Sequence, residues 1–199
     1  MKSANAPKAP QILAVARELI GAGGYNSFSY AELSATVGIT KASIHHHFPT
    51  KEALVKEVVR QYRAEGQEAL AALDASGLSP RERLAAYTGY WEQCVRDNVA
   101  SFCVCAMLAA EVSQIPVDVR AEVTAHFKEL LKWLTRTLEA GVKAGQFELA
   151  SPAKAEALTL MSTVNGAMLS ARAFGDPSVF AAIVQAAAGR IDLGRAKPG

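Results

Sequence analysis

The chain has 199 residues, a formal net charge of +2 and 50% hydrophobic residues. This composition supports a sizeable buried core and excludes both a disordered acidic tail and a histone-like polycation. The longest apolar runs, such as 102–110 and 179–184, fall far short of the roughly 18 residues that a membrane span needs. The N-terminus is polar and shows no export signal. We therefore expect a cytoplasmic protein with no membrane partner.

Charge is distributed unevenly along the chain. Residues 1–63 carry eight Lys or Arg against four Glu, an excess of +4, whereas the remainder carries 13 basic and 15 acidic residues. This asymmetry indicates an anionic partner for the N-terminal part alone.

Helical periodicity predicts three short helices at the start of the chain. Glycines follow the first two, a proline follows the third, and Ser29 and Thr40 are placed to cap the second and the third. The predicted ranges are 10–20, 30–37 and 41–47.

Longer segments with the same periodicity follow. The break Gly-Leu-Ser-Pro at 77–80, then Pro116, Gly145 and Gly175, divide them. The predicted ranges are 51–73, a helix from Pro80, 103–114, 117–144, 152–175 and 177–189. No segment shows the alternation of a strand, so we expect an all-α fold of about nine helices.

The stretch 30–47 combines a helix, a turn with Gly38 and a second short helix. The residues spaced to face inward are Leu33, Val37, Ile39, Ile44 and Phe48. The outward positions of the second helix are Lys41, Ala42, Ser43, His45 and His46. A short helix with small residues at its start can enter the major groove of DNA, so this stretch predicts a helix-turn-helix.

Residues 28–33 (FSYAEL) and 37–54 (VGITKASIHHHFPTKEAL) closely resemble the TetR family of bacterial transcriptional regulators. The family pattern is a Gly-(Val/Ile)-(Ser/Thr) turn, a short recognition helix ending in His-Phe, and Lys-Glu-x-Leu at the start of the fourth helix. The resemblance implies a DNA-binding domain in 1–55 and a ligand-binding and dimerisation domain in 56–199. It further implies a homodimeric repressor that a small molecule or an electrophile releases from a pseudo-palindromic double-stranded operator, with no cofactor.

The resemblance also assigns roles position by position. Lys41, Ala42 and His45 match the family's base-edge readers, with Thr40 at the start of their helix. The expected phosphate contacts are Ser43, His46, His47 and Lys51, with Ser29 and Tyr30 at the front of the preceding helix. The family usually has an aromatic residue at positions 45 and 46, and histidine there makes the contribution to affinity sensitive to pH.

A metal site is the alternative for the run His45-His46-His47. Consecutive positions of a helix point about 100° apart, so three such side chains cannot converge on one ion. We expect no metal there.

The C-terminal half offers candidates for a ligand pocket and for a dimer interface. Mixed aromatic, sulfur-containing and polar positions predict the pocket, although the same spacing is typical of a plain core: Tyr87, Trp91, Cys94, Cys103, Met107, Phe127, Trp133, Met161 and Asn165. Small residues in 151–175 and apolar ones in 176–189 predict dimerisation through the last two helices, with packing inside one chain as the alternative.

The cysteines leave a second function open. The three, Cys94, Cys103 and Cys105, form an odd set without an export signal, so we expect reduced thiols. A helix N-terminus lowers the pKa of a thiol, which favours reactivity of Cys103 or Cys105, as in family members that sense electrophiles. The alternative function is therefore a thiol- or metal-responsive binding protein that uses Cys103, Cys105 and His126. The cysteines could equally be buried and inert parts of the core. An enzyme is not expected, because no Walker, Rossmann, HExxH or GxSxG motif occurs.

Overall fold

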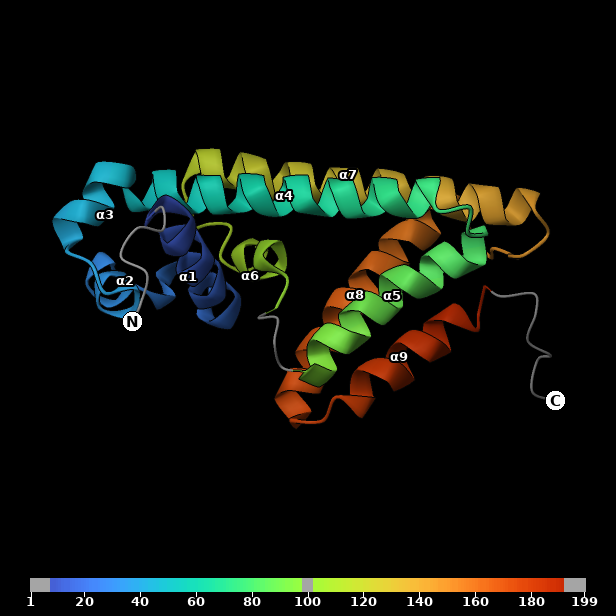
Figure 1. Ribbon diagram of the computed structural model, residues 1–199. Coiled ribbons are helices and arrows are strands. Elements are labelled where there is room, and N and C mark those ends of the chain that lie inside the picture. The colour runs from blue at the N-terminus through green and yellow to red at the C-terminus, as the bar shows by residue number, and fades with distance from the viewer. Residues whose placement is uncertain (1–7, 98–101, 192–199) are drawn as a thin grey trace. The chain divides into compact units, whose positions relative to one another are not determined.

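The structure, a computed structural model, describes residues 8–97 and 102–191 (Figure 1). In these ranges it contains nine α-helices, one short 3-10 helix and no β-strand, which confirms the predicted all-α fold. No helix within the same ranges is long and apolar enough to cross a membrane.

The helices follow one another as the sequence pattern predicts. Their bounds are α1 Lys8–Gly23, η1 Tyr25–Ser27, α2 Tyr30–Val37, α3 Lys41–His47, α4 Lys51–Ala75, α5 Pro80–Asp97, α6 Val104–Ala110, α7 Val117–Lys143, α8 Ala153–Phe174 and α9 Ser178–Ala188.

Two elements differ from the prediction. Helix α6 ends at Ala110 instead of 114, because the next residues form turns in which the N–H of Gln114 donates to the carbonyl of Glu111. The 3-10 turn η1 was not predicted, since the glycines before it and three polar or aromatic residues carry no periodicity. It begins after Gly24, whose φ of 86° is a conformation that glycine adopts without strain.

The described residues form two compact units. The first holds residues 8–65 and 102–126, and the second holds 66–97 and 127–191. The units divide between residues 65 and 66, inside α4, whereas the resemblance implied a boundary after residue 55. Helices α4 and α7 each contribute residues to both units.

The first unit has a core made by α1, the short helices and the start of α4. Its largest fully enclosed side chains are Ile12, Ile20, Leu33, Ile44, Leu54, Val55, Val59, Val104 and Leu108. Ion pairs join the start of α4 to the start of α7, between Lys56 and Asp118 at 2.6 Å and between Arg63 and Glu122. Arg17 of α1 pairs with Glu65 at 2.5 Å. Most of these charges are exposed and contribute little each, so the apolar core provides most of the stability of this unit.

A polar contact ties η1 to the turn after α6. The carboxylate of Glu111 accepts hydrogen bonds from the backbone N–H and the side-chain amide of Asn26, at 3.3 and 3.1 Å. The Asn26 amide also donates to Gln114 at 3.1 Å. A Cβ at Gly24 would lie 1.9 Å from Glu111 Oε1, so the carboxylate reaches this place only because residue 24 has no side chain.

The second unit is organised around one carboxylate at the end of α4. Asp74 accepts the indole N–H of Trp133 at 3.1 Å and pairs with Arg83 and Arg136 at 3.4 and 3.1 Å. The Trp133 ring packs at a tilt against Tyr87, with ring centroids 5.8 Å apart. Because a buried indole N–H needs an acceptor, Asp74 fixes this aromatic pair between α5 and α7.

Helices α8 and α9 pack on each other and on α5 (Figure 1). The covered face of α8 consists of Ala157, Leu160, Val164, Ala167, Met168 and Ala171. Phe180 of α9 is fully enclosed, and Gly175 ends α8 with a φ of 64°. This Gly stop is the one that the sequence indicated.

The substitution Gly141→Ala tests how tightly α7 packs in the second unit. A Cβ there would lie 2.0 Å from the Phe147 ring, and overpacking of this kind costs about 1–3 kcal/mol. We expect thermal unfolding, followed by circular dichroism, at a clearly lower temperature than for the wild type.

The matched control is Gly89→Ala in α5, where no atom lies within 4 Å of an added Cβ. Alanine favours a helix over glycine by about 1 kcal/mol, so this variant should unfold at the same or a higher temperature. Equal unfolding temperatures for Gly141→Ala and Gly89→Ala would contradict the described packing.

Candidate nucleic-acid interface

The first helix of the predicted helix-turn-helix, α2, has a well-defined N-terminal cap. Ser29 caps α2, and its hydroxyl accepts the Glu32 N–H at 3.3 Å while its own N–H donates to the Glu32 carboxylate at 2.7 Å. These hydrogen bonds lower the pKa of the Glu32 carboxyl group. Ser29 was predicted as the cap, and the structure adds Glu32, three residues later, as the second half of a capping box.

The turn between α2 and α3 depends on Gly38. Its φ of 72° and ψ of 39° place it in the left-handed region, and its N–H donates to the Ser34 carbonyl at 3.0 Å. Thr40 then begins α3, with its hydroxyl accepting the Ser43 N–H at 3.1 Å. Both caps agree with the sequence prediction, and together they fix the direction of α3.

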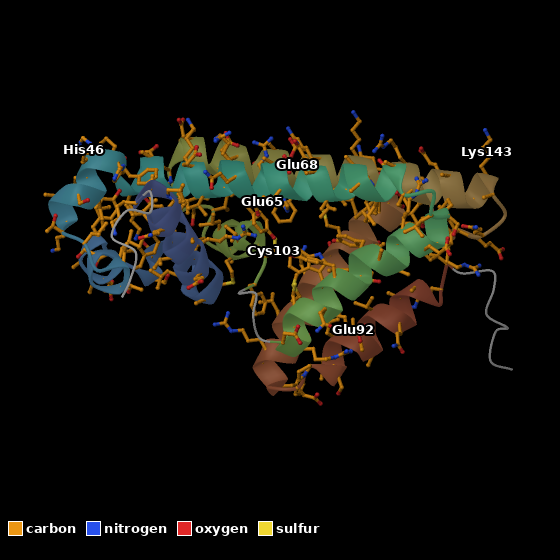
Figure 2. The ribbon with its side chains drawn as sticks, viewed as in Figure 1. His46, Glu65, Glu68, Glu92, Cys103 and Lys143 are labelled. Atoms are coloured by element: carbon orange, nitrogen blue, oxygen red, sulfur yellow. The ribbon has the colours of Figure 1, made fainter. Side chains whose placement is uncertain are left out.

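Burial divides α3 into two faces. Ile44 of α3 and Leu33 of α2 are both 0% exposed, so these two side chains belong to the core of the first unit. Val37, Ile39 and Phe48, also expected to face inward, are half-buried. The exposed side chains of α3 are Lys41, Ala42, His45, His46 and His47, with Ser43 half-buried. Figure 2 shows His46 on the outer side of α3.

The aromatic ring of Tyr30 anchors α2 to the end of α3. Its hydroxyl donates to the Phe48 carbonyl at 2.9 Å, and its ring lies 4.8 Å from that of His45. Burial, with a smaller effect of Tyr25, raises the pKa of Tyr30 to about 12. The phenol therefore stays protonated and keeps donating over the whole physiological pH range.

Lys51, at the start of α4, is engaged inside the first unit. Its Nζ donates to the Phe28 carbonyl at 2.5 Å and lies 4.8 and 4.3 Å from the ring centroids of Tyr25 and Phe28. Burial lowers the pKa of its ammonium group, an effect that Glu111 and Glu32 partly oppose. Its predicted phosphate contact stays a prediction, whereas these contacts show that it holds the residues before α2 against α4.

The predicted DNA-contacting residues therefore fall into two groups. Lys41, Ala42, His46 and His47 have exposed side chains without a role in capping, while Ser29, Tyr30, Thr40 and Lys51 bind backbone groups of the first unit. His45 combines both properties, because it is exposed and also contacts Tyr30 and the Pro49 carbonyl. The caps of Ser29 and Thr40 were predicted, whereas no sequence pattern indicated the contacts of Tyr30, His45 and Lys51, which join residues up to 23 positions apart.

The predicted pocket residues are divided between the two units. Cys103 and Met107 belong to the first, and the others, Tyr87, Trp91, Cys94, Phe127, Trp133, Met161 and Asn165, belong to the second. Tyr87 and Trp133 are buried against each other, and the remaining five of this group are half-buried. The Asn165 amide donates to the Met161 carbonyl at 2.9 Å, which holds this polar side chain against its own helix.

Cys103 precedes α6 and is almost completely enclosed, with 3% of its surface exposed (Figure 2). Its Sγ lies 4.0 Å from Nε2 of His126. Burial raises the pKa of the Cys103 thiol, although a hydrogen bond with Tyr62 acts in the opposite direction. The lower pKa expected from the helix terminus is therefore wrong for Cys103, because removal from water destabilises the thiolate more than the helix stabilises it.

Comparison with known proteins places this geometry in a family. Residues 12–58 match the family described as bacterial regulatory proteins, tetR family, and residues 80–187 match the tetracyclin repressor-like C-terminal domain. A crystal structure of a TetR-family transcriptional regulator from Agrobacterium tumefaciens is 51% identical, with a TM-score of 0.91 over 93% of this chain and 97% of that one.

Two curated relatives are more distant. The HTH-type transcriptional repressor KstR2 of Rhodococcus jostii (strain RHA1) is 29% identical over 69% of this chain and 66% of its own length. The HTH-type transcriptional repressor NemR of Escherichia coli (strain K12) is 29% identical over 65% of this chain and 66% of its own length. The chain thus spans slightly less than two thirds of the curated relatives that it matches.

The contribution of the α2 cap to the stability of the helix-turn-helix can be measured with Ser29→Ala. Loss of an N-cap hydroxyl costs about 1 kcal/mol, so we expect a lower free energy of unfolding in urea. Ser34→Ala, in the middle of the same helix, is the control, because the Ser34 hydroxyl only returns to the Ala31 carbonyl at 2.8 Å. A loss in Ser34→Ala as large as that in Ser29→Ala would contradict the assigned role of the cap.

The helix-turn-helix geometry, the match of both halves and the 51% identity to a solved regulator together show that this chain belongs to the TetR family of bacterial regulatory proteins.

Proposed function

We propose that this chain is a DNA-binding transcriptional repressor. It acts as a homodimer on a pseudo-palindromic double-stranded operator in the cytoplasm and leaves the operator when a small molecule binds. The observation that carries the proposal is the exposed surface of α3, where Lys41, Ala42 and His45 are exposed while Ile44 of the same helix is enclosed. The relatives KstR2 and NemR, both named transcriptional repressors, support it.

The exposed face of α3 offers chemically different groups to a major groove. Lys41 provides only donors, which suit guanine O6 and N7 or a phosphate, and the Ala42 methyl group suits the thymine methyl group. The other proposed DNA contacts are Ser29, Tyr30, Thr40, Ser43, His46, His47 and Lys51. In this proposal residues 1–55 bind DNA, and residues 56–199 bind the ligand and form the dimer.

The outer faces of α8 and α9 support the proposed dimer. Opposite its covered face, α8 exposes small and apolar side chains, and α9 exposes a similar set. They are Leu158, Ser162, Gly166, Leu169 and Ala173 of α8, Ala182 and Ala186 of α9, and Gly189 directly after α9. Small residues let helices approach closely, so these faces suit a bundle of four helices from two copies.

We propose that the ligand binds among the pocket candidates of the second unit, and the match to the tetracyclin repressor-like C-terminal domain supports this. The second unit has half-buried aromatic, sulfur-containing and polar side chains, such as Trp91, Met161 and Asn165. Such a mixture is typical of a site for a small organic molecule.

The thiol- or metal-responsive alternative has less support. Burial raises the pKa of Cys103, and no group of three or more His, Cys, Asp or Glu suited to a metal occurs in residues 8–97 and 102–191. We therefore retain the repressor as the proposed function.

The DNA-binding proposal predicts a specific effect of Lys41→Ala. The operator is first selected from randomised double-stranded DNA, and binding is measured by fluorescence anisotropy at several salt concentrations. A good contact to a base is worth about 1–3 kcal/mol, so we expect an affinity loss of roughly tenfold or more, with a shallower salt dependence if Lys41 also contacts a phosphate.

The matched control is Lys143→Ala, an exposed lysine at the end of α7 in the second unit (Figure 2). It removes the same charge and should leave the affinity unchanged. Equal losses for both variants, or a salt-independent affinity of the wild type, would argue against the proposal.

The proposed dimer predicts that Leu169→Glu produces monomers. Leu169 is 55% exposed on the outer face of α8, and a charge in the centre of an apolar interface costs several kcal/mol. We expect the mass measured by light scattering to fall by half. Val142→Glu is the control, because Val142 is 45% exposed on α7 and should leave the dimer intact; a dimeric Leu169→Glu variant would exclude this interface.

A further inference from the structure

The ring of His45 is held from two sides in the first unit. Its Nδ1 lies 3.1 Å from the Pro49 carbonyl oxygen, and its ring centroid lies 4.8 Å from that of Tyr30 at an interplanar angle of 60°. The Tyr30 hydroxyl donates to the neighbouring Phe48 carbonyl at 2.9 Å. Two consecutive carbonyls after α3 therefore fix both rings, so the imidazole is oriented before any DNA is bound.

These contacts determine which ring nitrogen carries the proton. A carbonyl oxygen only accepts hydrogen bonds, so Nδ1 of His45 must donate to Pro49. A neutral imidazole has a single N–H, and Nε2 is then left with a lone pair. Within the described residues Nε2 of His45 has no hydrogen-bond partner, which leaves it available as an acceptor.

The position of His45 on α3 places this acceptor beside the other exposed groups. Lys41 and Ala42 precede it by four and three residues, and such residues are neighbours on one face of a helix. The buried Ile44 precedes His45 by one residue and therefore points about 100° away from it around the helix axis. His45 therefore belongs to the face that the proposed function directs into the major groove.

Base edges in the major groove present few donors. The exocyclic amino groups, N4 of cytosine and N6 of adenine, are the donors there, whereas guanine presents N7 and O6 and thymine presents O4 as acceptors. Resting on the proposed function, we propose that His45 is a specificity-determining residue that accepts a hydrogen bond from an exocyclic amino group through Nε2. It thereby selects adenine or cytosine at one position of each half-site and rejects guanine and thymine, whose acceptors would face its lone pair.

The test begins with a selection from randomised double-stranded DNA by the full-length protein. Three variants undergo the same selection: His45→Phe, which keeps a ring against Tyr30 without the acceptor, His45→Lys, which has only donors, and His46→Phe. His46 is the matched control, because it is the adjacent exposed histidine of α3 and its ring contacts His47 at 5.4 Å.

We expect the wild type to require adenine or cytosine at one position per half-site. His45→Phe should lose the preference at that position alone, and His45→Lys should shift it to guanine. His46→Phe removes an expected phosphate contact, so it should lower the overall affinity and keep the base preference. A selected sequence that His45→Phe leaves unchanged would overturn the assignment of His45 while leaving the proposed function intact. A wild type that enriches no sequence would contradict the proposed function itself.

Base analogues distinguish the two amino groups. The selected adenine is replaced by purine without N6, or the selected cytosine by pyrimidinone without N4. The wild-type affinity should fall by about tenfold, within the range for one lost base contact, while His45→Phe should bind both duplexes equally. An unchanged wild-type affinity would overturn the proposal.

The tautomer can be observed directly in the free protein. Long-range proton–nitrogen NMR correlations at pH 8, where free imidazole is neutral, should show a protonated Nδ1 and an unprotonated Nε2 for His45. The opposite assignment would overturn the proposal without any DNA experiment.

Discussion

Enclosure of Ile44 is the constraint on which the exposed surface of α3, the proposed DNA-binding surface, depends. Helices α2 and α3 have eight and seven residues, and helices this short are not stable alone in water. Contact of Ile44 with the core around Leu33 holds α3 in place, and the periodicity of the helix then leaves Lys41, Ala42 and His45 outside. The exposed chemistry of α3 is thus a direct consequence of one buried side chain.

Five of the eight Lys and Arg side chains of residues 1–63 contact other groups of the first unit. Arg17, Lys56 and Arg63 form ion pairs with Glu65, Asp118 and Glu122, and Arg60 pairs with Glu57 on its own helix. Lys51 contacts a carbonyl and two aromatic rings. The charge asymmetry predicts an anionic partner, but four of the eight positive groups that produce it are paired with carboxylates of the first unit. We therefore expect the proposed recognition by α3 to depend more on a few oriented groups than on a general positive field.

The sequence predicted the fold better than it predicted the contacts. Local signals define helix ends, so Ser29, Gly38, Thr40, Pro80 and Gly175 located the caps and stops that the structure contains. The outward set of α3 also followed from periodicity. The roles of Lys51 and Tyr30 inside the first unit, and the raised thiol pKa of Cys103, depend on residues far away in the chain and on burial. Those properties arise only when distant segments pack, and no local pattern encodes them.

The contact between Glu111 and Gly24 has a consequence for how related sequences diverge. The carboxylate occupies the space of a Cβ at position 24, and the φ of 86° there already disfavours any other residue. Positions 24 and 111, separated by 86 intervening residues, are therefore under one shared restriction. Family members that keep an acidic residue at 111 should keep glycine at 24, and those that replace the glycine should carry a shorter side chain at 111. Covariation between positions 24 and 111 would indicate that this contact between η1 and the turn after α6 is kept across the family.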